Sequence, residues 1–118
     1  MKIKIKYFHI ITIIFISISH STTSFATFFT GNDLRDPIRE YRKAEAKDQS
    51  TNYIDAWTFR AFVIGAYDAT ENTYCGRIEK THQLLAIVAN YHEKHPEEWG
   101  DVAVNIVSRA LMEAFRCP

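Results

Sequence analysis

Glycine, proline and cysteine are scarce in this chain, which has 4 Gly, 3 Pro and 2 Cys among its 118 residues. So little Gly and Pro excludes a collagen-like or low-complexity chain, since those classes are rich in these residues. An excess of charge of one sign is also missing, because 14 Lys and Arg balance 14 Asp and Glu. A nucleic-acid-binding domain needs a basic face for the phosphates, so the balance argues against that class. What remains is one globular domain of ordinary composition.

A hydrophobic run long enough to cross a membrane is missing too. Three lysines in the first six residues precede an apolar run over residues 7–18, which is shorter than the ~20 residues of a spanning helix. Small residues follow at Ser24 and Ala26, where a signal peptidase would inspect the chain. We therefore expect residues 1–26 to be a secretory signal peptide that is cleaved after Ala26; the alternative is a membrane anchor. No cysteine directly follows the run, which excludes a lipoprotein anchor.

Residues 27–118 would then form one mature domain in the periplasm. Removal of three lysines leaves 11 basic against 14 acidic residues, a net charge of −3, so neither nucleic acid nor a membrane is an expected partner after cleavage. Both cysteines, Cys75 and Cys117, lie in this domain. Two cysteines in an oxidising compartment predict a disulfide; the alternatives are two free thiols or a bridge between chains.

Helical periodicity dominates the mature domain, and no strand pattern of comparable length occurs. The first predicted helix begins either at Asn32 or with Asp36 as its N-cap and Pro37 as its first residue, and Pro96 ends the third. The sequence thus predicts an all-α fold, a small four-to-five-helix bundle joined by one disulfide. The predicted helices cover about 32–47, 51–69 and 81–95, and a last one runs from between 96 and 101 to about 115.

The second predicted helix carries a strong apolar stripe, with large residues early and small residues late. Its spacing of three and four residues is that of one helix face. We expect the stripe to face the core and Gly65 to allow the close approach of another helix. The members of the stripe are Ile54, Trp57, Ala61, Phe62, Gly65, Ala66 and Ala69.

No residue pattern for catalysis or metal binding stands out. His92 and His95 flank a glutamate, but their spacing of three differs from the spacing of four with which two histidines on a helix bind zinc. Asp68 and Glu71 beside a loop are typical of a solvated helix end. No serine or cysteine has an activating neighbour pattern, and no Gly-rich phosphate loop occurs. We expect a protein that is not an enzyme and needs no metal or cofactor.

Aromatic and charged residues in two polar stretches, 71–77 and 92–99, suit a binding protein. Tyr74, Tyr91 and Trp99 lie in or beside loops among acidic residues, and such aromatics can anchor an interface. The alternative is that they cover the ends of a small core. The candidate partner-binding residues are Glu71, Asn72, Tyr74, Arg77, Glu93, Glu97, Glu98 and Trp99.

Several short motifs follow one another in an order that is more specific than each motif alone. They are Phe29–Leu34, Phe62–Ala69, the loop residue Cys75, Thr81–Leu84, His95–Glu97 and Ala110–Cys117. In this order they resemble the Rap/Tai family of periplasmic immunity proteins associated with type VI secretion. Two further cysteines of many relatives are missing here, and Gly76 stands where a proline is usual.

The resemblance implies a function that the residues alone do not give. Characterised relatives bind and neutralise a peptidoglycan amidase injected by a neighbouring cell, they act in the periplasm, and some form homodimers. It therefore implies an inhibitor that blocks the amidase cleft without chemistry, with a second copy as a further partner. The alternatives are a small periplasmic acid-stress chaperone similar to the HdeA family and a family member with an unrelated periplasmic binding role.

Overall fold

Four α-helices dominate the computed structural model, which describes residues 28–70, 74–78 and 80–118. In these ranges the backbone forms no strand, and an isolated bridge joins Thr30 to Val102. The predicted all-α class is confirmed, while the predicted signal peptide, residues 1–26, lies outside the described residues. None of the described helices combines the length and the apolar character of a membrane-spanning segment. The elements are η1 (Asn32–Leu34), α2 (Arg35–Glu45), α3 (Tyr53–Thr70), α4 (Thr81–Lys94), η3 (Pro96–Glu98) and α5 (Ala103–Ala114).

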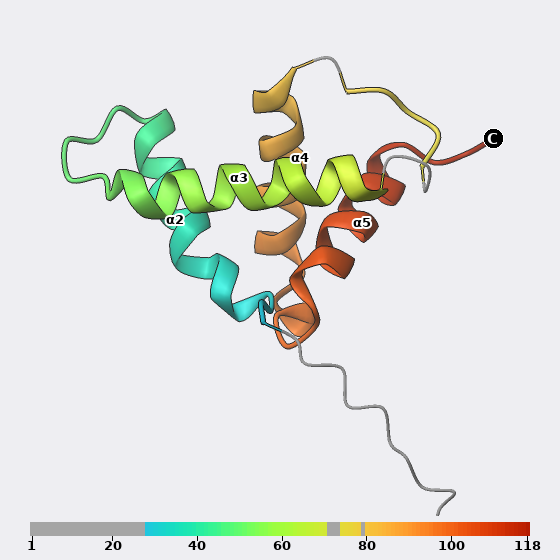
Figure 1. Ribbon diagram of the computed structural model, residues 1–118, viewed down its shortest axis with the longest axis horizontal. Helices are drawn as coiled ribbons and strands as arrows, with labels where there is room; N and C mark the ends of the chain where they lie inside the picture. The colour runs from blue at the N-terminus through green and yellow to red at the C-terminus, as the bar shows by residue number, and fades with distance from the viewer. Residues whose placement is uncertain (1–27, 71–73, 79) are drawn as a thin grey trace, which may run out of the picture.

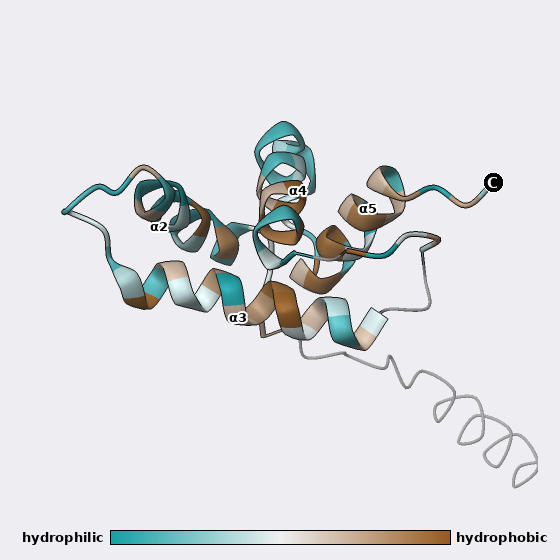
Figure 2. Ribbon diagram, turned by 90° about the horizontal axis from the view of Figure 1, so that it is seen from above, coloured by the Kyte–Doolittle hydropathy of each residue, from teal (hydrophilic) through white to brown (hydrophobic). Residues whose placement is uncertain are grey.

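The long helix α3 lies across the other three helices (Figure 1). It contacts α2, α4 and α5, and a view turned by 90° shows all three on the same side of it (Figure 2). The described helices therefore form two layers, with α3 alone in one of them. One side of α3 is covered by the rest of the fold, and its opposite side is not.

The hydrophobic core lies between these two layers. The residues Ala56, Phe59, Val63 and Ala66 of α3 are buried, and they follow the three-and-four spacing of one helix face. The ring of Phe59 packs on that of Tyr41 of α2, with the ring centroids 5.2 Å apart. The buried side chains opposite α3 include Ile38, Leu84, Leu85, Val88, Ile106, Val107, Ala110 and Leu111.

The apolar stripe that the sequence places in the core is divided between two faces of α3. Phe62 and Ala66 pack on the core, but Ile54 is 79% exposed and Trp57 is 67% exposed. A Cβ added at Gly65 would meet no atom within 4 Å, so the prediction that Gly65 packs against another helix is wrong. Both faces of α3 are apolar, and periodicity alone cannot decide which of two apolar faces is buried.

The segment before α2 is held against the turn between α4 and α5. The amide N–H of Gly31 donates to the carbonyl O of Asp101 (2.9 Å), and that of Asn32 donates to the carbonyl O of Trp99 (2.7 Å). A Cβ at Gly31 would lie 2.8 Å from the Cα of Trp99. The two backbones therefore approach so closely that only glycine fits at this position.

Both predicted starts of the first helix differ from the observed one. Asn32 begins a single 3₁₀ turn, and α2 begins at Arg35. Pro37 is the third residue of α2 and still lies in the first turn, where an N–H would have no partner within the helix. The predicted end of the third helix is confirmed, since α4 ends at Lys94 and Pro96 starts η3.

A disulfide joins Cys75 to Cys117, with the two Cα atoms 4.8 Å apart. The predicted intramolecular bridge is confirmed, and the alternative of free thiols is ruled out. The amide N–H of Cys75 also donates to the carbonyl O of Phe115 (3.2 Å), and a side chain at Gly76 would run into the Phe115 ring. Residues 74–78 are thus held against the C-terminal end of α5.

Candidate functional site

Tyr74, a predicted interface anchor, is part of the core. It is only 7% exposed, and its ring lies 5.6 Å from that of Tyr67 and 6.4 Å from that of Phe115. Of the two interpretations of this aromatic residue, the one in which it covers the core holds, because the disulfide at the next residue, Cys75, holds this part of the loop against α5. A partner cannot reach the Tyr74 ring while the loop stays in this position.

Trp99, the second predicted anchor, is stacked on His92 in the turn between α4 and α5. Their ring centroids lie 5.2 Å apart, the indole N–H donates to the carbonyl O of His92 (2.8 Å), and the Arg35 guanidinium lies 4.5 Å from the indole centroid. His92 is buried, and its Nε2 lies 2.7 Å from the carbonyl O of Gly31, so Nε2–H must be the donor. Burial lowers the pKa of His92, which favours the neutral imidazole. Trp99 therefore helps to hold the N-terminal segment in place.

Two acidic residues of the second predicted stretch are paired within the chain. Glu98 accepts a hydrogen bond from the Tyr91 hydroxyl (3.1 Å) and another from Nε of Arg109 (2.9 Å). Glu93 accepts two from the Arg42 guanidinium, at 3.1 and 2.9 Å. The Glu93 pair joins α4 to α2, and the Glu98 pair joins η3 to α5. These carboxylates consequently stabilise the packing of helices, and only their outer surfaces are open to a partner.

Among the predicted acidic residues that the structure describes, Glu97 is the most exposed, with 67% of its side chain open to solvent. Its carboxylate lies 2.9 Å from Nδ1 of His95. The ligand atoms of His95, Glu97 and Glu98 lie within 4.8 Å of one another. Because Glu98 is already held by a tyrosine and an arginine, this group has the arrangement of a surface hydrogen-bond network.

Helix α4 separates the two predicted stretches (Figure 1). Its 14 residues span about 20 Å at the rise of an α-helix. Arg77 is exposed before one end of α4, and Glu97 is exposed beyond the other. Glu71 and Asn72 lie outside the described residues. The candidate residues that the structure describes therefore do not form one continuous surface.

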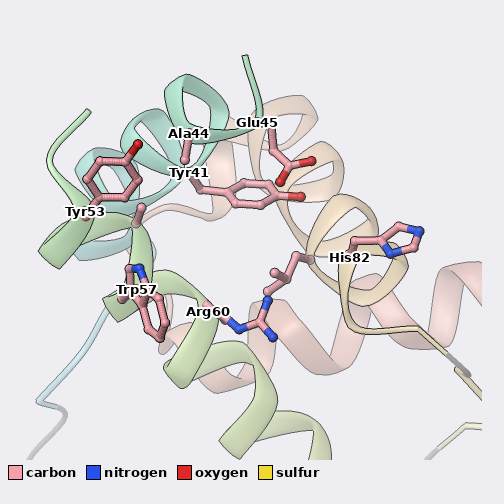
Figure 3. A pocket seen from close by; sticks show the side chains of 9 residues that line it. Tyr41, Ala44, Glu45, Tyr53, Trp57, Arg60 and His82 are labelled. Carbon is pink, nitrogen blue, oxygen red and sulfur yellow. The ribbon is translucent and has the colours of Figure 1, made fainter. Parts of the chain in front are cut away.

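A cavity of about 380 Å³ opens between α2, α3 and α4 (Figure 3). Tyr41 and Glu45 come from α2, Arg60 comes from α3, and His82 comes from α4. Tyr41 is buried, and burial raises the pKa of its hydroxyl. The remaining lining residues are Ala44, Tyr53, Ala56, Trp57 and Leu85.

The side chains around the cavity fit a protein partner better than a chemical reaction. Among the described residues that line the cavity, Glu45 is the only carboxylate and none is a serine, threonine or cysteine, so these residues offer no aliphatic hydroxyl or thiol nucleophile beside a base. Tyr53 and Trp57 form an exposed aromatic edge next to Arg60. Tryptophan, tyrosine and arginine are the residues that most often dominate binding energy in protein interfaces.

The loop between α2 and α3, residues 46–52, projects from the molecule beside this cavity (Figure 1). Residues 46–50 are exposed, yet the loop is braced from within. The Asp48 carboxylate accepts the amide N–H of Ser50 (2.8 Å), and the carbonyl O of Asp48 accepts the amide N–H of Thr51 (3.2 Å). Lys47 has φ of 56°, the left-handed conformation with which many helices end. The loop therefore has a defined shape before any partner binds.

Glu40, buried on α2, fixes the far end of this loop. Its carboxylate accepts the amide N–H of Asn52 (2.8 Å) and the Lys43 ammonium (2.9 Å). These bonds lower the pKa of Glu40 to about 2. The side-chain O of Asn52 in turn accepts the amide N–H of Ile54 (3.1 Å), which caps the N-terminus of α3. Glu40 thus connects α2, the loop and α3 through one carboxylate.

A family model for Rap1a immunity proteins matches residues 30–117, which is most of the chain. The chain belongs to the Rap1a immunity protein family. The predicted family is confirmed, and membership implies that this Rap1a protein binds a cognate effector toxin in a type VI immunity role, as a non-enzymatic inhibitor. No curated protein and no solved structure matches the chain.

The motifs that carry the resemblance have structural roles in this Rap1a protein. Gly31 allows the close contact with Trp99, Cys75 and Cys117 form the bridge, and Pro96 starts the turn after α4. These residues maintain the fold of a Rap1a protein, and so they do not report which surface meets the toxin.

The sequence predicts a loop between the first two helices, but sequence reasoning did not propose loop 46–52, or the aromatic edge formed by Tyr53 and Trp57, as a binding surface. The signal for the aromatic edge was present, because α3 carries more apolar residues than a single buried face can hold. For the loop, Asp48 and Ser50 form the short-range pattern of a side chain that bonds its own backbone two residues on. No local pattern could have revealed Glu40, whose amide partner lies twelve residues away.

Proposed function

We propose that this Rap1a protein is a periplasmic immunity protein that binds a type VI-secreted peptidoglycan amidase and inhibits it by occupying its cleft. The family match over residues 30–117 carries the proposal. The expected signal peptide would bring the protein to the periplasm, where an amidase meets the cell wall. Loop 46–52 and the cavity beside it supply a surface with the exposure and composition that suit a protein partner.

The loop 46–52 is the element best shaped to enter a cleft. An enzyme cleft is concave, so its blocker must be convex, and this loop projects into solvent (Figure 1). Glu40 and Asp48 hold the loop in one conformation by the hydrogen bonds described above. A loop that is already ordered before binding loses less conformational entropy on association, and the affinity for the partner is higher as a result. Lys47 and Gln49 are exposed on the loop and would contact the amidase.

The proposal is tested with a cognate amidase and two pairs of substitutions. Lys47→Asn with Gln49→Ala removes two long side chains from the loop and keeps a residue that tolerates the left-handed backbone. We expect affinity by calorimetry to fall about tenfold or more, as when an interface anchor is lost, with a parallel loss of inhibition of peptidoglycan hydrolysis. The matched control is Arg77→Ala with Glu97→Ala, at the two exposed positions of the stretches first predicted from sequence, and it should bind as tightly as the wild type.

Each other outcome has a clear meaning. If the control pair loses affinity and the loop pair does not, the contact surface is the one first predicted from sequence. If the protein binds no amidase, the proposed target is wrong. Suppression of aggregation of unfolded proteins at low pH, with no amidase binding, would instead support the acid-stress chaperone.

A further inference from the structure

A second cleft lies between α2 and the end of α4. It encloses about 330 Å³, which is within the range of sites that take small ligands. Three arginines of α2, spaced four and three residues apart, stand along one face of the helix and gather positive charge in a chain whose charges balance overall. The residues that line the cleft are Arg35, Asp36, Ile38, Arg39, Arg42, His92, Glu93 and Trp99.

Two of the three arginines are already paired with carboxylates. Arg39 donates to Asp36 (2.7 Å), and Arg42 donates twice to Glu93, at 3.1 and 2.9 Å. Arg35 forms no ion pair with any of the residues that the structure describes. The lining side chains thus carry three positive charges against two negative ones, which leaves one positive charge unmatched.

The unmatched guanidinium of Arg35 is held in place by an aromatic ring. It lies 4.5 Å from the centroid of the Trp99 indole. The indole is itself fixed, since its ring stacks on that of His92 and its N–H donates to the carbonyl O of His92 (2.8 Å). A guanidinium over a ring keeps the N–H groups at its edges, in a planar fork that matches the two oxygens of a carboxylate. Arg35 therefore has the geometry of a carboxylate receptor before any ligand arrives.

We propose that this cleft binds the free carboxylate at the end of a short peptide, with Arg35 as the residue that receives it. Two N–H groups on one edge of the guanidinium would donate to the two carboxylate oxygens. Ile38 and Trp99 add apolar surface to the lining, which suits a small apolar side chain on the last residue of the peptide. The single negative charge of the ligand matches the single unmatched positive charge of the cleft.

Ligands with more negative charge fit this cleft less well. A phosphate group carries up to about two negative charges at neutral pH, and the carboxylates of Asp36 and Glu93 would repel the second. A strongly acidic surface or a nucleic acid would need several unpaired cations, whereas Arg39 and Arg42 are already neutralised within the chain. A single carboxylate is therefore the group whose charge the cleft matches.

The cleft is separate from the surface proposed for the toxin. Loop 46–52 follows the far end of α2 (Figure 1), and its first residue lies about 16 Å along the helix from Arg35. A bound peptide would therefore leave the loop uncovered. In the proposed periplasm, free peptide ends come from proteins, which end in L-residues, and from the cell wall, whose peptides end in D-residues. Both offer the same carboxylate to Arg35, so experiment must distinguish them.

Calorimetric titration with small peptides tests the proposal on the full exported protein. The probes are N-acetyl-alanyl-alanine in its L,L and D,D forms, and the control is the same peptide with a C-terminal amide. We expect a Kd of about 1 mM or lower for the acid, which is ordinary for a ligand of this size. The amide should bind at least about tenfold more weakly, because it brings no charge to Arg35. Tighter binding of the D,D form would identify wall peptides as the source, and tighter binding of the L,L form would identify protein ends.

Substitutions of Arg35 separate binding from folding. Arg35→Lys keeps a cation over the indole but loses the planar fork, so the affinity for the peptide should fall about fivefold or more while the melting temperature stays unchanged. Arg35→Gln should lower the affinity further. Arg116→Gln removes the same charge at an exposed position and should bind like the wild type. Asp36→Asn should bind more tightly, since it releases Arg39 for the ligand, and damage to the fold would not produce such a gain.

The indole N–H signals locate the bound peptide. The chain has two tryptophans, so in a proton–nitrogen correlation spectrum the peptide acid should shift the signal of Trp99 and leave that of Trp57 in place. The proposal is overturned if the acid does not bind at up to about 10 mM, if acid and amide bind equally, or if inorganic phosphate binds more tightly than the peptide. An equal loss of affinity in Arg116→Gln and Arg35→Gln would also overturn it. Amidase inhibition through loop 46–52 would stand in each of these cases.

Discussion

His92 of α4 donates its Nε2–H to the carbonyl O of Gly31 over 2.7 Å, and this bond joins the core to the first segment of the domain. The imidazole is buried, and Trp99 stacks on its ring. Protonation would keep the donor but would bring a positive charge into a site that burial and the nearby Arg35 make unfavourable for it. The fold therefore stabilises the neutral form of His92.

We expect the free energy of unfolding to fall as the pH drops below about 6.5. The fold lowers the pKa of His92 from its ordinary value of 6.5, so the unfolded chain takes up the proton first, and stability falls until folded His92 is protonated too. His92→Gln keeps a donor for Gly31 and does not titrate in this range. Urea unfolding between about pH 7.5 and 5 measures the free energy of unfolding at each pH. This free energy should change less with pH for the variant than for the wild type. Equal slopes would contradict this role of His92.

Glu40 should control stability at a lower pH. Its pKa is lowered from 4.5 to about 2 by the amide of Asn52 and the ammonium of Lys43. Its contribution is therefore complete above about pH 4.5 and is lost as the pH falls through about 2. Glu40→Gln should lower the melting temperature at neutral pH and remove part of this acid dependence. The matched control is Glu113→Gln, at an exposed glutamate of α5. It should leave the melting temperature at neutral pH and the acid dependence of stability unchanged.

Two glycine substitutions should differ sharply in their effect on stability. At Gly31 a Cβ would lie 2.8 Å from the Cα and 3.0 Å from the carbonyl O of Trp99, which are backbone atoms. Gly31→Ala should thus destabilise the fold by about 1–3 kcal/mol, as overpacking does. At Gly100 a Cβ would meet nothing within 4 Å, so Gly100→Ala should change stability by less than about 0.5 kcal/mol. Chemical denaturation measures both, and equal losses would contradict the close contact at Gly31.

Loss of the disulfide should lower the stability of the fold without unfolding the helices. The bridge joins residues 42 positions apart, and chain entropy assigns a loop of that size up to about 4 kcal/mol. Cys117→Ser should accordingly melt at a lower temperature by circular dichroism, with nearly unchanged helix content, because the buried faces of the helices do not include the bridge. Wild-type protein after reduction should behave like the variant. An unchanged melting temperature would show that the bridge contributes nothing to stability.

The sequence was sufficient for those parts of the fold that rest on local chemistry. Pro96 disfavours a helical backbone at the residue before it, and two cysteines in one domain can form only one intramolecular bridge. The four main helices follow from the three-and-four spacing of apolar residues, which depends only on neighbours along the chain. The family motifs added the class of partner, because their order is a property of the whole chain.

The remaining features depend on contacts between distant segments. Which face of α3 is buried was decided by α2, α4 and α5, so Trp57 and Gly65 were assigned to the wrong side. In the sequence, Tyr74 and Trp99 look like loop aromatics. In the structure, the disulfide at Cys75 holds Tyr74 in the core, and Trp99 stacks on the buried His92. In the sequence, Glu40 looks like any glutamate within a helix. Its role in holding the loop becomes visible only from its hydrogen bond with the distant amide of Asn52.

The order in which the chain emerges constrains when this domain can fold. The amide of Gly31 pairs with the carbonyl of Asp101, 70 residues later in the sequence, and Cys75 must wait for Cys117, 42 positions later. In the export to the periplasm that we propose, a chain that crosses the membrane in extended form, N-terminus first, can complete neither contact until α5 has followed. Local helices can form earlier, but closure of the N-terminal segment and of the disulfide must wait for α5 and Cys117, since long-range contacts require both partners to be present. A chain truncated before α5 should consequently remain open to proteases, however well its first three helices are made.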